Sequence, residues 1–190
     1  IYGKKAISDL MRELNEIEGL KWIRILYSYP EDVDAEFVKA VKECEKVLPY
    51  FDMPVQHAND AILKLMNRKT SKQQIKENID RIRKEIPEAS IRTSIIVGFP
   101  TETQEQFDEL CEFVKEVKFD RLGVFAYSRE EDTPAAILEG QIDEDIKQER
   151  KNRLMEIQQG ISYEKNKTFV RSTLEVMIDE KVEDGLYEGR

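Results

Sequence analysis

The chain of 190 residues contains 40% hydrophobic and 36% charged residues, and its formal net charge is -9 at pH 7. This length and hydrophobic content suffice for one sizeable core and indicate a globular chain. The acidic excess opposes non-specific attraction to a phosphate backbone and suits a basic protein partner better. No apolar run approaches the roughly 18 residues that a membrane span needs, and the N-terminus lacks a signal-peptide pattern. We therefore expect a cytoplasmic protein without a membrane segment.

The first quarter of the chain predicts a helix, a strand and a second helix. Apolar residues spaced three and four apart over 6–17 mark one helix face. Strand-forming residues cover 22–27, and Pro30 ends that strand. From Asp34, a suitable N-cap, the apolar spacing predicts a helix that includes Val47 and ends before Pro49.

The rest of the chain alternates between strands and helices. The patterns predict a strand at 50–55, helices at 59–67 and 71–85, a strand at 90–97, a helix after Thr103 with Gln106 completing a capping box, a strand at 121–127, and a long charged helix at 143–168. Four strands separated by helical stretches are typical of a parallel sheet with right-handed crossovers. The sequence therefore predicts an α/β fold, a partial parallel β/α (TIM-like) barrel.

The pattern changes near Thr173, where apolar residues begin to recur every second position and 183–185 predicts a turn. We therefore predict a boundary there, with one domain over 1–172 and the beginning of a small β domain over 173–190. The chain opens on Ile1 rather than Met, and its last strand pattern stops at Arg190. We expect both ends to be cut from a longer protein.

Two segments place polar residues directly after a buried strand and before a helix. Gln56 follows the second predicted strand, and Gly98 follows the aliphatic run at 95–97. Because the carboxyl ends of parallel strands meet at one edge, these groups predict a shared ligand pocket. Ser94, Ile96 and Gly98 should point the same way from their strand.

Three motifs, in this order and spacing, resemble the radical-SAM methylthiotransferases. They are PVQHAND followed by LKLMNR at 54–68, IRTSIIVGFPTET at 91–103 and VFAYSREEDTPAA at 124–136. Within that family, His57-Ala58, YSYP at 27–30 and YFDMP at 50–54 look most like the RimO branch. That branch adds a methylthio group to an aspartate of a small-subunit ribosomal protein, whereas the sister branch modifies an adenosine in tRNA.

The resemblance implies that 1–172 is the C-terminal part of a radical-SAM core and that 173–190 begins a TRAM-like substrate-binding domain. It also implies S-adenosylmethionine and [4Fe–4S] clusters as cofactors. Such enzymes hold the cluster with three cysteines spaced C-x₃-C-x₂-C. Cys44 and Cys111 are the only cysteines, lie far apart, and are typical of free structural thiols in a reducing compartment. We therefore expect the cluster ligands upstream of Ile1, outside this chain.

Two residues take cofactor roles from the resemblance. Gln56 would contact the ribose of S-adenosylmethionine, since its amide can both donate and accept hydrogen bonds. Arg68 would hold the carboxylate of the cofactor, because a guanidinium offers two parallel donors. The alternative for Arg68 is that it merely covers the C-terminal end of its helix, where a cation is favoured.

Four residues of the next strand and its turn complete the predicted cofactor set. Ser94 stands where related sequences often carry Asp, and its hydroxyl would bind the ribose more weakly than a carboxylate. Ile96 lies on the same strand face. Gly98 would let the backbone approach the ligand closely, and Phe99 would border the adenine.

Four further residues are candidates to line the pocket. His57 is the only histidine and directly follows Gln56. An imidazole at a pocket rim could act as an acid or base, yet single histidines are more often satisfied polar residues. Ser28, Tyr127 and Ser128 also end predicted strands at this edge, where aromatic residues more often plug a barrel.

Two functions follow from these observations. In the first, the chain is part of a radical-SAM methylthiotransferase, inactive as this piece alone, that modifies a basic ribosomal protein or, as the alternative, tRNA. In the second, it is a non-catalytic α/β module that binds a nucleotide-like ligand or a protein. A C-x₃-C-x₂-C motif upstream of Ile1 would discriminate between them.

Overall fold

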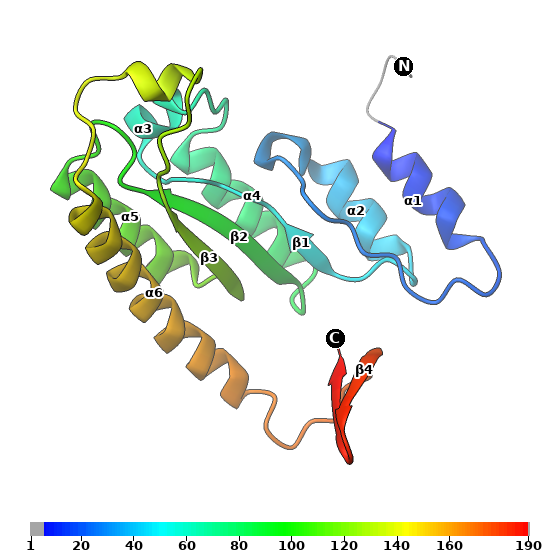
Figure 1. Ribbon diagram of the computed structural model, residues 1–190. Helices are drawn as coiled ribbons and strands as arrows, with labels where there is room; N and C mark the ends of the chain where they lie inside the picture. The colour runs from blue at the N-terminus through cyan, green and yellow to red at the C-terminus, as the bar shows by residue number, and fades with distance from the viewer. Residues whose placement is uncertain (1–5, 190) are drawn as a thin grey trace.

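The computed structural model describes residues 6–189 and contains one parallel sheet with helices packed on one of its faces (Figure 1). The sheet consists of β1 (Tyr50–Asp52), β2 (Ser90–Val97) and β3 (Arg121–Ala126), with β2 in the middle. The helices are α1 (Ile7–Asn15), α2 (Ala35–Glu43), α3 (Asp60–Leu65), α4 (Lys72–Glu85), α5 (Gln104–Val117) and α6 (Glu144–Lys167), with short 3-10 turns at Pro30–Asp32 and Pro134–Ile137. The predicted partial α/β fold is confirmed.

Strand β2 shows that one face of the sheet is covered and the other is open. Its residues alternate between buried and half-buried along the whole strand. The buried side joins a core that includes Phe51 of β1, Ile79 of α4 and Phe113 of α5. The alternation is typical of a sheet with one face packed on the core. Ser94 and Ile96 lie on the other face and keep part of their surface accessible.

The predicted helix starts at Asp34, Ser71 and Thr103 are confirmed by their caps. Asp34 accepts a hydrogen bond from a backbone amide in the first turn of α2. Ser71 and Thr103 each form a capping box with the glutamine three positions later. These bonds satisfy amides that a helix leaves unpaired at its start. Helix α2 ends earlier than predicted, because Cys44 adopts an extended backbone.

The first predicted strand, over 22–27, is wrong as a regular strand. The segment runs parallel to the chain that leads into β1, but only Ile23 forms a bridge, with Val47. Further along, the Ser28 amide donates to a β1 carbonyl at 2.8 Å. Tyr27 has a φ of 65°, and this left-handed backbone interrupts the extended conformation that a ladder needs.

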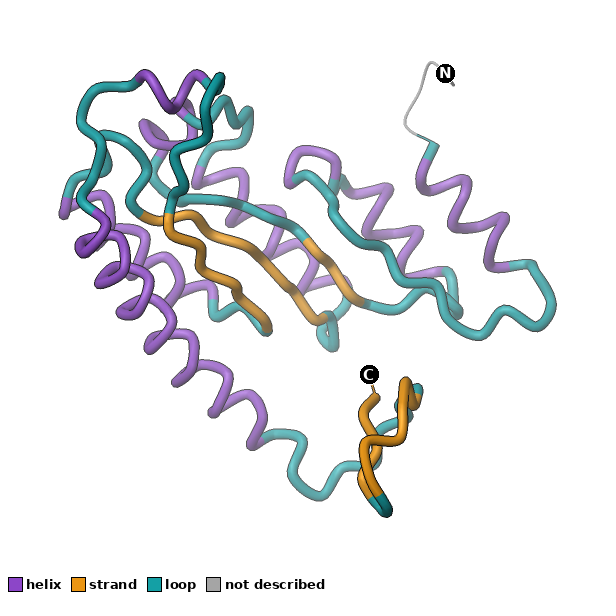
Figure 2. The backbone as a smooth tube through the Cα atoms, in the orientation of Figure 1, coloured by secondary structure: helices purple, strands orange, loops and turns teal. Residues whose placement is uncertain are grey.

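The two-residue pattern after 173 forms an antiparallel hairpin. Strands β4 (Ile178–Glu183) and β5 (Leu186–Gly189) pair around Gly185, whose φ of 81° suits the tight turn. Every residue of the two strands is exposed. Figure 2 shows the hairpin beyond the end of α6, apart from the parallel sheet. The division into domains 1–172 and 173–190 stays a prediction.

Candidate functional site

Main-chain hydrogen bonds join the predicted strand ends at one edge of the sheet. The Gln56 amide donates to the Ser94 carbonyl, and the Ile96 amide donates to the Gln56 carbonyl, both at 2.9 Å. The Tyr127 amide donates to the Val97 carbonyl, also at 2.9 Å. Residues from three separate motifs therefore meet where the parallel strands end, near α3 in Figure 1.

A bulge after β1 sets the position of Gln56. The ladder pairs Asp52 with Arg92, and the next bridge pairs Gln56 with Ile95. The chain therefore advances four residues from 52 to 56 while β2 advances three from 92 to 95. One extra residue bends the strand and turns the residues that follow toward a new direction.

The bulge is held by a buried hydroxyl and a tight turn. The Thr93 hydroxyl accepts from the Val55 amide at 3.2 Å and donates to the Met53 carbonyl at 2.9 Å. It thereby satisfies two backbone groups that the bulge removes from the ladder. Gln56 has a φ of 70°, and the His57 amide donates back to the Val55 carbonyl at 2.9 Å. Such a left-handed γ-turn is rare and strained for a residue with a side chain.

His57 lies inside the protein rather than at a pocket rim. Its ring is fully buried, and Nδ1 accepts a hydrogen bond from the Asn59 amide at 2.9 Å. The Asn59 side chain caps α3 and donates to Glu109 of α5 at 2.6 Å. Burial raises the pKa of Glu109, but hydrogen bonds from Asn59 and Lys72 outweigh it and hold the pKa below its usual value. The loop after β1 is therefore fixed to α5.

The polar side chains of Gln56, Ser94 and Arg68 at this edge have no hydrogen-bond or ion-pair partner among residues 6–189. The buried hydroxyl of Tyr127 also has no hydrogen-bond partner within these residues. The Arg68 guanidinium carbon lies 5.6 Å from the centre of the Tyr29 ring, a cation–π contact that leaves its N–H groups free. No hydrogen bond from this guanidinium to an α3 carbonyl occurs in the described part of the chain, so the helix-covering alternative has no contact that supports it.

An apolar cluster borders these polar groups. Ile62 of α3, Phe99 and Tyr127 are buried together, and Ile96 packs against them with part of its surface exposed. The Phe99 and Tyr127 rings meet edge to face, with centroids 5.2 Å apart. Phe99 thus packs inside the turn after β2, and Ile96 presents the accessible apolar surface at this edge.

Gly98 is required by helix packing. Its φ is 70°, and a Cβ built on it would lie 2.4 Å from Cγ of Lys147 in α6. Its amide donates to the Glu102 carboxylate at 2.8 Å. Helix α6 therefore packs closely against this glycine, whose N–H is already bonded within the protein, and the approach of a ligand to Gly98 stays a prediction.

Comparison with known proteins places the chain in a family. The profile of the radical SAM superfamily matches residues 3–114. The chain belongs to the radical SAM superfamily. A crystal structure of SuiB from Streptococcus suis is 18% identical to the chain with a TM-score of 0.46; the match covers 88% of the chain and 34% of SuiB.

Two curated relatives carry the name ribosomal protein uS12 methylthiotransferase RimO. The one from Clostridioides difficile (strain 630) is 54% identical over 190 residues, and the one from Clostridium botulinum (strain Eklund 17B / Type B) is 52% identical over 191. Both matches cover the whole chain. The chain spans 43% and 42% of the length of these two relatives.

Radical SAM proteins use S-adenosylmethionine and iron–sulfur clusters, and cysteine thiolates are the ligands of such clusters. Cys44 lies at the end of α2 and Cys111 in α5, and both are buried free thiols. Burial raises the pKa of the Cys111 thiol to about 11, which keeps it protonated and unreactive near neutral pH. Over residues 6–189, no three His, Cys, Asp or Glu side chains gather in a way that could hold a metal ion.

The two serine candidates lie nearer to the surface. Ser28 is half-buried and helps to line a cavity of about 330 Å³ beside Tyr27 and Tyr29. Ser128 is exposed, and its hydroxyl donates to Glu130 at 2.8 Å. Within residues 6–189 neither hydroxyl forms a hydrogen bond with Gln56, and their pocket roles stay predictions.

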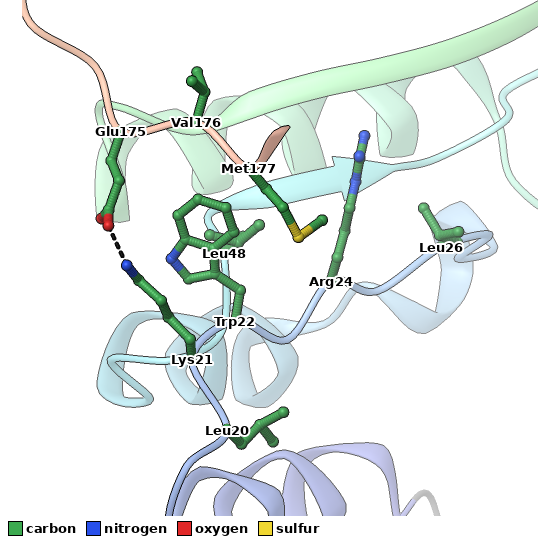
Figure 3. A pocket seen from close by; sticks show the side chains of 9 residues that line it. All are labelled: Leu20, Lys21, Trp22, Arg24, Leu26, Leu48, Glu175, Val176 and Met177. Carbon is green, nitrogen blue, oxygen red and sulfur yellow. Dashed lines mark hydrogen bonds and ion pairs between the residues drawn. The ribbon is translucent and has the colours of Figure 1, made fainter. Parts of the chain in front are cut away.

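A more apolar cavity lies away from the strand ends. It measures about 530 Å³ and lies between 20–26 and 175–177, where Trp22 and Met177 line it. An ion pair between Lys21 and Glu175 closes one side (Figure 3). None of the predicted cofactor residues lines this cavity.

Among the helices of residues 6–189, none has the length and apolar character needed to cross a bilayer.

Glu102 is a buried residue whose role the sequence did not reveal. The sequence interpretation of 101–103 was a helix start, which the Thr103 cap confirms. The Glu102 side chain, however, is fully buried and pairs with Arg150 of α6 at 2.9 Å. The two residues are 48 positions apart, so no local spacing signals the pair.

Proposed function

We propose that the chain is the cofactor-binding part of a radical-SAM methylthiotransferase that inserts a methylthio group into an aspartate of the small-subunit ribosomal protein uS12. Two relatives with that name are 54% and 52% identical to the chain over its whole length, and this similarity supports the proposal. The observation that carries it is the group of Gln56, Ser94 and Arg68, whose polar side chains have no partner within the described residues at the edge where a ligand would bind.

The donor set at this edge fits S-adenosylmethionine. The Arg68 guanidinium is free to bind the cofactor carboxylate with two parallel hydrogen bonds. The amide of Gln56 and the hydroxyl of Ser94 can bond the ribose hydroxyls. Ile96 offers accessible apolar surface to the adenine, while Phe99 supports that surface from inside the turn.

A [4Fe–4S] cluster, when bound, supplies the electron that splits S-adenosylmethionine into methionine and a 5′-deoxyadenosyl radical. We propose that its ligands come from outside this chain, because Cys44 and Cys111 are buried in separate helices. The contribution of this chain is to bind and orient the cofactor. The bulge after β1 presents Gln56, and the turn at Gly98 fixes the neighbouring backbone.

The buried position of His57 favours a supporting role over acid–base catalysis. Its Nδ1 already accepts a bond from the Asn59 amide, and the ring has no exposed surface. A group that exchanges protons with a substrate must come within hydrogen-bond reach of it. We therefore propose that His57 shapes the loop that carries Gln56, and that Tyr127 acts likewise through its packing on Phe99.

The proposed substrate is a basic protein, and the proposed compartment is the cytoplasm, where ribosomes are modified. A net charge of -9 favours a cationic ribosomal protein over an anionic RNA, since complementary fields raise encounter rates. The names of the relatives support the same substrate. The tRNA-modifying alternative and the non-catalytic ligand-binding module are outcomes of the following test.

The test uses the full-length protein with reconstituted clusters, incubated with S-adenosylmethionine, a sulfur source and a reductant. Purified uS12 and tRNA are offered separately, and both are examined by mass spectrometry. We expect the mass gain of one methylthio group on uS12 and none on tRNA. A gain on tRNA alone assigns the protein to the sister branch. Binding of a ligand without any modification supports the non-catalytic module.

A further inference from the structure

The edge proposed to bind the cofactor, here called the cofactor edge, includes the loops after β1 and β2. The single buried carboxylate of Glu102 connects these two loops to α6. Glu102 Oε2 accepts from the Gly98 amide at 2.8 Å and lies 3.5 Å from Nε2 of His57. Its Oε1 accepts from the Arg150 guanidinium at 2.9 Å. The same Arg150 nitrogen also donates to the Glu102 carbonyl at 3.1 Å. Loops after β1 and β2 thus meet α6 at one side chain.

The carboxylate needs Arg150 because it has no contact with water. The side chains of Glu102 and His57 are both fully buried, and that of Arg150 is 8% exposed. A buried charge is tolerated when it is paired and hydrogen-bonded, and it strongly destabilises a protein when its partner is removed. Arg150 is therefore the partner that compensates the buried carboxylate of Glu102 between the loops.

Both loops carry residues that the proposed function assigns to cofactor binding. Gln56 is adjacent to His57, and Gly98 lies between Ile96 and Phe99 in the turn after β2. The Gly98 amide is fixed directly by Glu102. Lys147, one turn before Arg150 on α6, fills the space beside Gly98. Helix α6 thus approaches this edge with side chains from two successive turns.

We propose that Arg150 is a positioning residue for S-adenosylmethionine, acting through Glu102 on the two loops that hold the cofactor. The proposal rests on the proposed function of this edge. Arg150 touches no cofactor atom in this scheme. It holds the carboxylate that fixes the Gly98 amide and packs beside His57, so that the side chains of Gln56 and Ile96 keep the geometry that the ligand needs.

Arg153 provides a matched control one turn further along α6. Both arginines contact the Phe107 ring, at 5.4 Å for Arg150 and 5.5 Å for Arg153. Arg153 pairs with the exposed carboxylate of Asp108 at 2.8 Å instead of with Glu102. Replacing either residue by Ala removes one ion pair and one ring contact, but only Arg150→Ala affects the buried carboxylate.

The experiment compares the two variants in the full-length, cluster-loaded protein. Amide hydrogen exchange is measured over 56–59 and 98–102, and S-adenosylmethionine binding is measured by calorimetry. We expect Arg150→Ala to accelerate exchange in both segments and to weaken binding roughly tenfold, because small misplacements of binding groups are costly. Arg153→Ala should match the wild type in both measurements.

A second variant keeps the proposal testable if Arg150→Ala does not fold. The double variant Glu102→Gln with Arg150→Ala removes the buried charge together with its partner, and it keeps an oxygen that can accept from Gly98. This double variant should fold. It should bind S-adenosylmethionine about as weakly as is expected for Arg150→Ala, because α6 no longer holds the two loops. Wild-type affinity in either folded variant, or equal exchange in the Arg150 and Arg153 variants, overturns the proposal. Failure of the wild type itself to bind S-adenosylmethionine overturns the proposed function instead.

Discussion

The strand-end edge of the parallel sheet and the C-terminal hairpin are held in contrasting ways. At the edge, Gln56 keeps a strained backbone because Thr93, the β2 ladder and the buried Glu102 network fix the residues around it. The hairpin residues bond to one another across β4 and β5, and all of them are exposed. The contacts of 50–150 therefore determine the strand-end edge, whereas residues 175–177 before the hairpin are held by an exposed ion pair with Lys21 and by the cavity beside Trp22.

Truncation of a large side chain to alanine should affect the free energy of unfolding very differently in the two regions. Phe51 of β1 is 2% exposed and packs on Phe37, whereas Tyr187 of β5 is 56% exposed. Phe51→Ala should lower the free energy of unfolding by about 3–5 kcal/mol, because it leaves a cavity in a packed core. Tyr187→Ala should change it by less than about 0.5 kcal/mol. Urea unfolding measures both, and similar losses would contradict the comparison.

Cofactor affinity should depend on the edge residues in a definite order. Arg68→Ala in the full-length protein should weaken S-adenosylmethionine binding by about 1.5–3 kcal/mol, since a charge-assisted bidentate contact is lost. Gln56→Ala should cost less, and Ser94→Ala least, because neutral groups make weaker hydrogen bonds. Calorimetry decides the order. Unchanged affinity in Arg68→Ala would return this residue to a helix-covering role.

The bulge predicts a requirement for a hydroxyl at position 93. Thr93→Val keeps the shape of the side chain but leaves the Val55 amide without its partner in a buried site. We expect a loss of about 1–3 kcal/mol in the free energy of unfolding. Thr93→Ser keeps the hydroxyl and serves as the control, so it should be the more stable of the two. The reverse order would show that packing of the methyl group matters more than the hydrogen bonds.

Local patterns predicted the helices and the shared edge, and long-range contacts explain what was missed. The caps at Asp34, Ser71 and Thr103 depend on neighbours three positions away, so sequence spacing reveals them. Parallel strand order then places the motifs at one edge. The strand at 22–27 was wrong because strand propensity does not supply a pairing partner.

The packing of α6 against Gly98 was also not predictable from local sequence patterns. Its motif predicts a ligand close to the backbone, and the structure adds that Lys147 of α6 fills the space where a Cβ would lie. The bond between Glu102 and Arg150 joins residues 48 positions apart. Which distant helix approaches a turn depends on the packing of the whole fold, and a single sequence contains no direct signal of that approach.

The carboxylate of Glu109 should give the edge a weak dependence on pH. Hydrogen bonds from Asn59 and Lys72 overcome the effect of burial and lower its pKa in the folded state. The folded protein therefore binds fewer protons at this group, and the stabilisation is complete above the unfolded value of about 4.3. It is lost as pH falls through the lowered folded value. Glu109→Gln should show a shallower loss of stability in acid, measured by urea unfolding at several pH values, and an unchanged slope would contradict this assignment.

The smallest expected effect concerns the ion pair that holds residues 175–177, the linker before the hairpin. Lys21 pairs with Glu175 beside the cavity that Trp22 and Met177 line (Figure 3). The pair is exposed, so Lys21→Ala should change the free energy of unfolding by less than about 1 kcal/mol. Trp22 is the only tryptophan of this chain and lines the same cavity, and Lys21 also contacts its ring, so its fluorescence reports on the surroundings of the pair. We expect a red shift of its emission in Lys21→Ala, and a similar shift in the wild type at high salt, because screening weakens an exposed pair. A constant emission in both would mean that apolar contacts from Met177 hold the linker, and that the hairpin is tied to the sheet more firmly than the comparison implies.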